Sequence, residues 1–250
     1  MDRRKGRRIK RRDPALERRI DALVQDNGLS RAVATQVALG RVELNDILRK
    51  MALNAEVEGI IRKHDLARAL ATQVALGQAE LEAVLFKRRM GEYFETGGLR
   101  SLLTDSQAAG QSVALALHGG RNIEGLVTQV DQYELEIQVD GQTERLHKLQ
   151  VKWGAPAADR KKVGRSLGWD KALKGAATEP VGRPQDRYSC SNKRMYGYLD
   201  RGATVTVRLV EGEIFKGTVT WVSRFEFGLE VKGHVGAVIF RHAMIHISES

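Results

Sequence analysis

The six histidines are the side chains of this 250-residue chain with the widest range of chemistry open to them. They are His64, His118, His147, His234, His242 and His246. Only the last two come close to a metal-ligand spacing, and the single cysteine, Cys190, offers no cysteine cluster to complete such a site. The sequence also lacks a phosphate-binding loop, an HExxH motif and a nucleophile elbow. We therefore expect neither an enzyme nor a metal or other cofactor.

Two of these histidines adjoin a basic residue near the end of two similar stretches of sequence. His147-Lys148 closes the stretch over residues 117–151, and Arg241-His242 closes the stretch over residues 209–247. Each stretch is a turn, a long strand, a second strand, a turn and a third strand, followed by the basic–histidine pair and a last short strand. We expect the two pairs to occupy equivalent places in two related modules.

Strand periodicity supports this interpretation of both stretches. Leu135, Ile137 and Val139 alternate with polar residues, as strands with one buried face do. Asp140-Gly141 is typical of a tight hairpin, and Gly125 in mid-strand permits a sharp bend. Short strands and close turns indicate a small barrel of the SH3-like or Sm-like kind.

An internal repeat with an offset of 37 residues precedes these modules. Residues 29–50 and 66–87 are identical at 14 of 22 positions, and each copy predicts a helix that ends at Gly40 or Gly77. A further helix follows in each copy with an apolar stripe, namely Leu44, Ile47 and Leu48 or Leu81, Val84 and Leu85. We predict a tandem helical repeat over about 20–51 and 57–90, whose copies stack and bury the stripes.

Positive charge concentrates outside these modules. The net charge is +10; residues 1–12 hold eight Lys/Arg against one Asp, and residues 154–195 hold ten against four acidic residues. The predicted organisation is a disordered basic arm over 1–12, the helical repeat within 13–92, a first β-module over 98–153, a flexible basic linker over 154–195 and a second β-module over 196–250. Basic tails bind nucleic acid by releasing counterions. The arm residues are Arg3, Arg4, Lys5, Arg7, Arg8, Lys10, Arg11 and Arg12.

The two β-modules resemble the Sm fold of the bacterial RNA chaperone Hfq. The first carries the resemblance through Gly120, Gly125, Asp131-Gln132-Tyr133 and Leu146-His147-Lys148-Leu149. The second does so through Gly212, Gly217, Ser223-Arg224-Phe225 and Phe240-Arg241-His242-Ala243. Together they cover roughly 100 residues. The resemblance implies an α+β chain, with an N-terminal all-α tandem repeat followed by two small five-stranded Sm-like barrels.

The resemblance also implies partners and a site. Members of the family form rings of Sm units that bind single-stranded, uridine-rich RNA, so two units per chain suggest a homotrimer with six units in the ring. The aromatic residue of each turn would stack on a base, and the polar and basic residues would bond the base and backbone. One interface would combine Gln132 and Tyr133 with Arg241 and His242. The other would combine Arg224 and Phe225 with His147 and Lys148.

A second RNA-binding face is implied at the turns that open each module. Its candidates are Gly120, Arg121, Asn122 and Gly212. This face departs from the family pattern, because Ala116 and Arg208 stand where the family carries an aromatic residue.

We thus expect an RNA chaperone or post-transcriptional regulator. The alternatives are an oligomeric ring scaffold that recruits protein partners through the helical repeats, and a DNA-associated regulator that uses the helical half. A single cysteine fits a reducing compartment such as the cytoplasm. No apolar run approaches the roughly 20 residues of a membrane span, so we expect no membrane partner.

Overall fold

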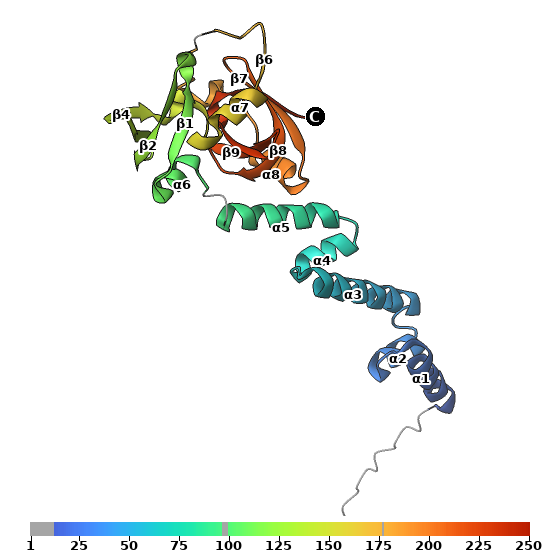
Figure 1. Ribbon diagram of the computed structural model, residues 1–250. Helices are drawn as coiled ribbons and strands as arrows, with labels where there is room; N and C mark the ends of the chain where they lie inside the picture. The colour runs from blue at the N-terminus through green and yellow to red at the C-terminus, as the bar shows by residue number, and fades with distance from the viewer. Residues whose placement is uncertain (1–12, 97–99, 177) are drawn as a thin grey trace, which may run out of the picture. The chain divides into compact units, whose positions relative to one another are not determined.

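The computed structural model describes residues 13–96, 100–176 and 178–250 (Figure 1). They form two compact units that divide between Phe86 and Lys87. The predicted basic arm over residues 1–12 lies outside the described residues. None of the described helices is long and apolar enough to cross a membrane.

The described part of the N-terminal unit is helical. Its helices are α1 (Pro14–Asn27), α2 (Arg31–Ala38), α3 (Leu44–His64), α4 (Arg68–Ala75) and the start of α5 (Leu81–Thr96). Asp13 caps α1 by accepting a hydrogen bond from the Ala15 N–H at 2.9 Å. Gly40 and Gly77 follow α2 and α4 with φ of 69° and 68°, the left-handed region that glycine enters without steric cost.

The 37-residue repeat is preserved in the polar contacts of this unit. Helix α2 packs on α1, and α4 packs on α3. Arg31 bonds Asp21 between α1 and α2, and Arg68 bonds Glu58 at the equivalent place between α3 and α4. Helix α3 runs for 21 residues, so it serves both as the last helix of the first copy and as the first helix of the second. The copies are therefore joined through a shared helix.

The C-terminal unit contains the remaining elements. They are α6 (Leu102–Ala109), β1 (Ser112–Leu117), β2 (Asn122–Val130), β3 (Glu134–Val139), β4 (Gln142–His147), β5 (Val151–Pro156), α7 (Arg160–Ser166), β6 (Gly168–Trp169), α8 (Asn192–Asp200), β7 (Thr204–Leu209), β8 (Glu213–Val222), β9 (Glu226–Val231), β10 (Val235–Phe240) and β11 (Met244–Glu249). The segment over 154–195, expected to be a flexible linker, thus carries α7 and β6. Strand β6 pairs with β8, and Val163 of α7 is fully buried.

The expectation of two separate five-stranded barrels is wrong. Within the described residues the strands form one open 11-stranded antiparallel sheet, in the order β11-β7-β8-β9-β10-β5-β1-β2-β3-β4 with β6 attached to β8. Helices α6, α7 and α8 are interspersed among the strands rather than confined to the N-terminal half. The sheet is continuous because β10 pairs with β5, through Val238 with Gly154 and Ile239 with Trp153. An exposed strand edge carries unpaired N–H and C=O groups, and this pairing satisfies two such edges at once.

The two halves of the sheet also exchange core residues. Trp221, Val238 and Phe240 from the second half pack in the cluster built around β1 to β5. Trp153 and Ala155 from β5 pack in the cluster built around β7 to β11. Neither half therefore completes its own core.

We expect Ile239→Ala to lower the free energy of unfolding of this unit by about 2–5 kcal/mol, because it empties a fully buried site at the β10–β5 junction. Ile245→Ala on β11 is the matched control; Ile245 is 38% exposed, so its loss should cost less than about 1 kcal/mol. Urea denaturation followed by tryptophan fluorescence measures both. Equal stabilities of the two variants would contradict a stabilising junction.

Candidate nucleic-acid interface

Two exposed aromatic side chains stand on equivalent turns of the sheet. Tyr133 lies between β2 and β3 and is 62% exposed, and Phe225 lies between β8 and β9 and is 67% exposed. Each turn is closed in the same way, by a backbone hydrogen bond from Asp131 to Glu134 at 2.9 Å and from Ser223 to Glu226 at 2.8 Å. The two turns therefore present an aromatic ring to solvent in the same local setting.

Polar and basic groups surround the ring of the first turn. The rings of His147 and Tyr133 lie nearly parallel, with centroids 6.4 Å apart. The Gln132 side-chain amide donates to the Tyr133 hydroxyl at 2.9 Å. The backbone N–H of Lys148 donates to the Tyr133 carbonyl at 2.8 Å, and its ammonium donates to the carbonyl of Asp131. These four predicted site residues therefore form one cluster.

The second turn is organised by arginines. The guanidinium of Arg224 lies 5.4 Å from the centroid of the Phe225 ring. The backbone N–H of Arg241 donates to the Phe225 carbonyl at 2.8 Å. The Arg241 guanidinium donates to the carbonyls of Ser223 and Arg224, each at 3.1 Å, and also bonds Cys190 and Asn192. Burial lowers the pKa of Arg241. This arginine therefore fixes the turn through both of its terminal nitrogens.

His242 lies inside the junction between the halves. Burial lowers its pKa to about 4, assisted by the charges of His118 and Arg187 and opposed by hydrogen bonds with the backbone of Leu149 and Val151. Its Nε2 is buried and has no hydrogen-bond partner among the described residues. The imidazole is therefore neutral at pH 7 and adds no positive charge for RNA. The structure thus places His242 against the first half of the same chain.

The junction also brings Lys148 to the second aromatic turn. Glu226, next to Phe225, is buried and accepts from the Leu102 N–H at 3.4 Å. Burial raises the pKa of Glu226 to about 7, against hydrogen bonds from Ser101 and Leu102 and the charge of Lys148. Burial lowers the pKa of Lys148, and the charge of Glu226 opposes that shift. The charge of Lys148 therefore acts on Glu226, beside the Phe225 turn, within a single chain.

The candidates for a second face lie at the other ends of β2 and β8. Arg121 forms a two-pronged ion pair with Glu144, at 2.5 and 2.6 Å, and Asn122 donates to the Gly120 carbonyl at 3.3 Å. Gly120 donates its N–H to Glu211 at 3.2 Å. Gly212 is buried beneath residues 170–174, with φ of 92°. Gly212 is thus covered, whereas the other three line a cavity.

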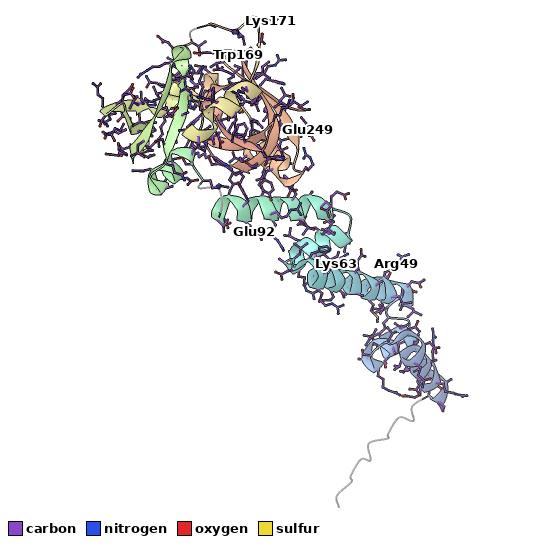
Figure 2. All side chains as sticks on the ribbon, viewed as in Figure 1. Arg49, Lys63, Glu92, Trp169, Lys171 and Glu249 are labelled. Atoms are coloured by element: carbon purple, nitrogen blue, oxygen red, sulfur yellow. The ribbon has the colours of Figure 1, made fainter. Side chains whose placement is uncertain are left out.

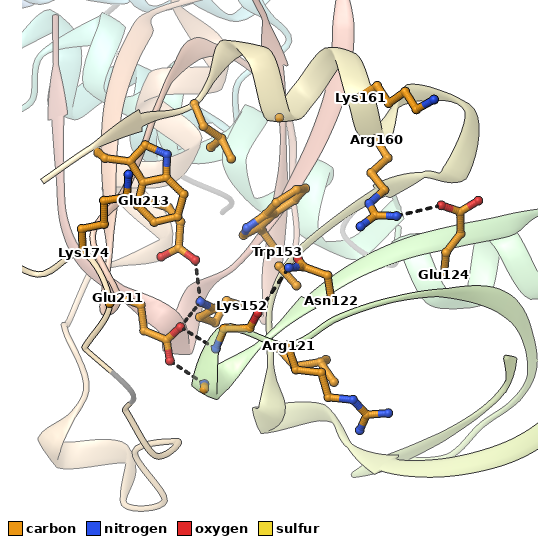
Figure 3. A pocket seen from close by; sticks show the side chains of 18 of the residues that line it. Arg121, Asn122, Glu124, Lys152, Trp153, Arg160, Lys161, Lys174, Glu211 and Glu213 are labelled. Atoms are coloured by element: carbon orange, nitrogen blue, oxygen red, sulfur yellow. Dashed lines mark hydrogen bonds and ion pairs between the residues drawn. The ribbon is translucent and has the colours of Figure 1, made fainter.

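This cavity has a volume of about 1050 Å³ and includes residues that the sequence interpretation missed. Figure 3 shows Trp153 and Lys152 within it, with Arg160, Lys161 and Lys174 around it. Trp169 also lines this cavity. In Figure 2, Trp169 lies at one end of the C-terminal unit and Glu92 of α5 at the other. Next to Glu92, the Tyr93 hydroxyl bonds Val222 at the base of the Phe225 turn. The cavity and the Phe225 turn therefore lie at opposite ends of β8.

A signal for these residues was present in the sequence. Lys161, Trp169 and Lys174 combine positive charge with an aromatic ring in a segment that lacks lasting periodicity, which led us to expect a linker. Within the described part of the chain, no group of three or more His, Cys, Asp or Glu side chains is arranged to hold a metal ion.

No protein-family model matches the chain, and no curated protein matches it.

We expect the Glu226→Gln variant to gain stability relative to the wild type as pH rises. Glu226 has a pKa of about 7 in the folded chain and about 4.5 when unfolded, so its contribution to stability is complete below pH 4.5 and is lost between pH 4.5 and 7. The amide cannot ionise, so the difference in unfolding free energy should grow over that interval to at most about 3 kcal/mol.

Chemical denaturation at several pH values between 4 and 8 measures this difference. Glu95→Gln, an exposed carboxylate of α5, is the control and should track the wild type. A constant difference between wild type and Glu226→Gln would contradict the raised pKa.

Proposed function

We propose that the protein binds single-stranded RNA through the two aromatic turns. The observation that carries the proposal is the exposure of Tyr133 and Phe225 at equivalent turns, each beside a basic or histidine side chain. Folding normally buries rings of this size, so two matched exposed rings indicate a surface kept for a ligand. Single-stranded nucleic acid is bound by this combination of stacking ring and positive charge, because every base has a π face.

The resemblance to Hfq supports RNA as the nucleic acid and U-rich sequence as the preference. Gln132 beside Tyr133, and Arg224 beside Phe225, provide hydrogen-bond donors at the edge of a stacked base. His147 and Lys148 adjoin the first ring, and the charge of Lys148 also acts on Glu226 beside the second turn. The basic residues of the arm over 1–12 would supply phosphate contacts. The cellular role that fits is that of an RNA chaperone or post-transcriptional regulator in the cytoplasm.

We further propose that copies of the chain associate through the two ends of the sheet. Strands β4 and β11 are the first and last strands of the sheet, so each has one edge without a neighbouring strand among the described residues. Within the chain, β10 of the second half pairs with β5 of the first half in an antiparallel way, and we expect the same kind of pairing between copies. Pairing of β4 with β11 of the next copy is a head-to-tail contact, which closes into a ring when the rotation allows it. Three chains would then place six aromatic turns in one ring.

We expect RNA binding to depend on the two rings. Tyr133→Ala/Phe225→Ala should weaken binding of a short oligouridylate by at least about tenfold, because each stacked base contributes roughly 1–3 kcal/mol. Tyr133→Phe/Phe225→Tyr retains both rings and should bind as the wild type does. Fluorescence polarisation with oligo-U, oligo-A and duplex DNA at about 50 and 200 mM salt measures this.

Equal, steeply salt-dependent binding of all three probes that is unchanged in the Ala variant would mean that only basic segments contact nucleic acid. The scaffold alternative would then take the place of RNA binding.

We expect Thr143→Pro to dissociate the oligomer. In an antiparallel pair, residues bonded to the neighbouring strand alternate with residues whose N–H and C=O point away from it. The Lys148 N–H bonds the Tyr133 carbonyl, so counting back along β4 from Lys148 makes Thr143 a residue of the second kind. The Thr143 N–H therefore points away from β3, toward the outer edge of β4. Proline removes that donor and leaves the pairing with β3 intact. Light scattering after gel filtration should give the mass of three 27.8-kDa chains for the wild type and of one chain for the variant.

Thr143→Val keeps the N–H and should remain trimeric. A wild-type chain that is monomeric at all concentrations would rule out the edge pairing without affecting the RNA-binding test.

A further inference from the structure

We propose that the cavity at the junction of the two halves binds a nucleotide whose base carries an exocyclic amino group. The cavity does not include the aromatic turns. Its lining takes in Gly120, Arg121 and Asn122 from the turn before β2, and adds α7, β6 and the chain that follows, which the resemblance does not cover. The proposal therefore goes beyond the RNA-binding function and does not depend on it.

The floor of the cavity is a buried cluster of charges. Lys152 lies between Glu211 and Glu213, and 2%, 6% and 4% of these side chains, respectively, are exposed (Figure 3). The ammonium of Lys152 is 2.5 Å from Glu213 and also bonds Glu211. Two carboxylates thus face one ammonium in the floor.

The two carboxylates differ in how far they are satisfied. Glu211 accepts from the N–H groups of Gly119 and Gly120 and from Thr178. Although burial opposes it, hydrogen bonds from Lys152, Gly119 and Thr178 hold the pKa of Glu211 below its usual range. Glu213 has one buried oxygen, Oε2, with no hydrogen-bond partner among the described residues. An unsatisfied buried acceptor is costly, so this oxygen indicates a donor that the free chain does not provide.

One wall of the cavity offers a flat aromatic surface, because Trp169 is open to solvent whereas Trp153 is 7% exposed and packs in the core. Trp153 comes from β5, and its ring contacts Phe215 edge-on at 5.5 Å. Trp169 of β6 is 44% exposed, and the ammonium of Lys174 lies 5.3 Å from its ring centroid. An exposed indole beside a cation suits a planar base attached to a phosphate.

The rim of the cavity is basic. Arg121, Arg160, Lys161 and Lys174 contribute four positive charges against the single carboxylate of Glu124. Arg121 is paired with Glu144, and Arg160 lies 3.4 Å from Glu124. Lys161 is exposed, and the described residues provide it with no acidic partner. The rim therefore suits phosphate.

The floor has an unpaired hydrogen-bond acceptor, the wall has an aromatic ring and the rim is basic. These features match the amino group, the planar ring of the base and the phosphate of a nucleotide. The amino groups of adenine, cytosine and guanine donate hydrogen bonds. Uracil has one donor, which lies between two carbonyl oxygens that a carboxylate would repel. We therefore expect discrimination against uracil here, the reverse of the preference proposed for the aromatic turns.

The test is a titration of the full-length protein with AMP, CMP, UMP and inorganic phosphate. Binding is measured by quenching of tryptophan fluorescence and by calorimetry. We expect AMP and CMP to bind at least about fivefold more tightly than UMP, since a carboxylate left unpaired by the wrong base is a large loss. Phosphate alone should bind more weakly than any of the three. Equal binding of UMP and AMP, or no binding of any nucleotide, would overturn the proposal.

Two surface substitutions test the walls and the rim. Trp169→Ala should weaken AMP binding by about tenfold, the loss of one stacking partner. Lys161→Gln should weaken it about fivefold, whereas Lys162→Gln, on the same helix and outside the cavity, should not change it. AMP binding that survives Trp169→Ala unchanged would place the nucleotide elsewhere and overturn the proposal.

The experiment also identifies the source of the nucleotide. An oligoadenylate that binds more tightly than AMP and loses that affinity in Trp169→Ala identifies a strand of nucleic acid as the source. AMP affinity equal to that of the oligomer identifies a free nucleotide. The Tyr133→Ala/Phe225→Ala variant should retain AMP binding, so failure at the turns and failure at the cavity give different results.

Discussion

The pairing of β10 with β5 is the interaction on which the rest of the β-rich unit depends. It brings together strands that lie more than 80 residues apart in the sequence. Because of it, Trp221 and Val238 complete the core around β1 to β5, and Trp153 completes the core around β7 to β11. Small β-units bury little apolar surface alone, so the shared core accounts for two similar halves in one sheet.

The same junction concentrates polar groups that water would otherwise solvate. Lys152, Glu211 and Glu213 are removed from solvent together, as are His118 and His242. A buried ion pair often adds little net stability, because desolvation offsets its attraction. Its requirement for matched partners does penalise a shifted strand register. We infer that the buried charges define how the halves meet, and that the cavity follows from this arrangement.

The features that could be predicted from the sequence are those set by neighbouring residues. The offset of 37, the glycine caps at Gly40 and Gly77, and the Asp140-Gly141 hairpin with positive φ at both residues all arise within a few positions. The pairing of β10 with β5 could not be predicted in this way, because strand periodicity shows which face is buried but not which edge finds a partner. Helix α7 and strand β6 were missed for a related reason, since they have only seven and two residues.

The role of individual cations is likewise a tertiary property. Arg241 and Lys148 were chosen as RNA contacts for their charge, yet both direct donors at backbone carbonyls of the turns, Arg241 at Ser223 and Arg224, and Lys148 at Asp131. A guanidinium whose two terminal nitrogens already donate organises a turn but has fewer donors left for a phosphate.

In the proposed RNA binding, the residues that stack on the bases are therefore different from those that contact the phosphates. The folded unit holds the aromatic rings in place, and rigid rings lose little entropy when a base stacks on them. Arg224 and His147 remain beside the rings to orient a base. Most phosphate contacts must then come from cations outside the turns. Such contacts are non-directional and salt-dependent, so they suit an arm that carries eight Lys/Arg residues in 12 positions. Base selection and backbone affinity would then reside in different parts of the chain.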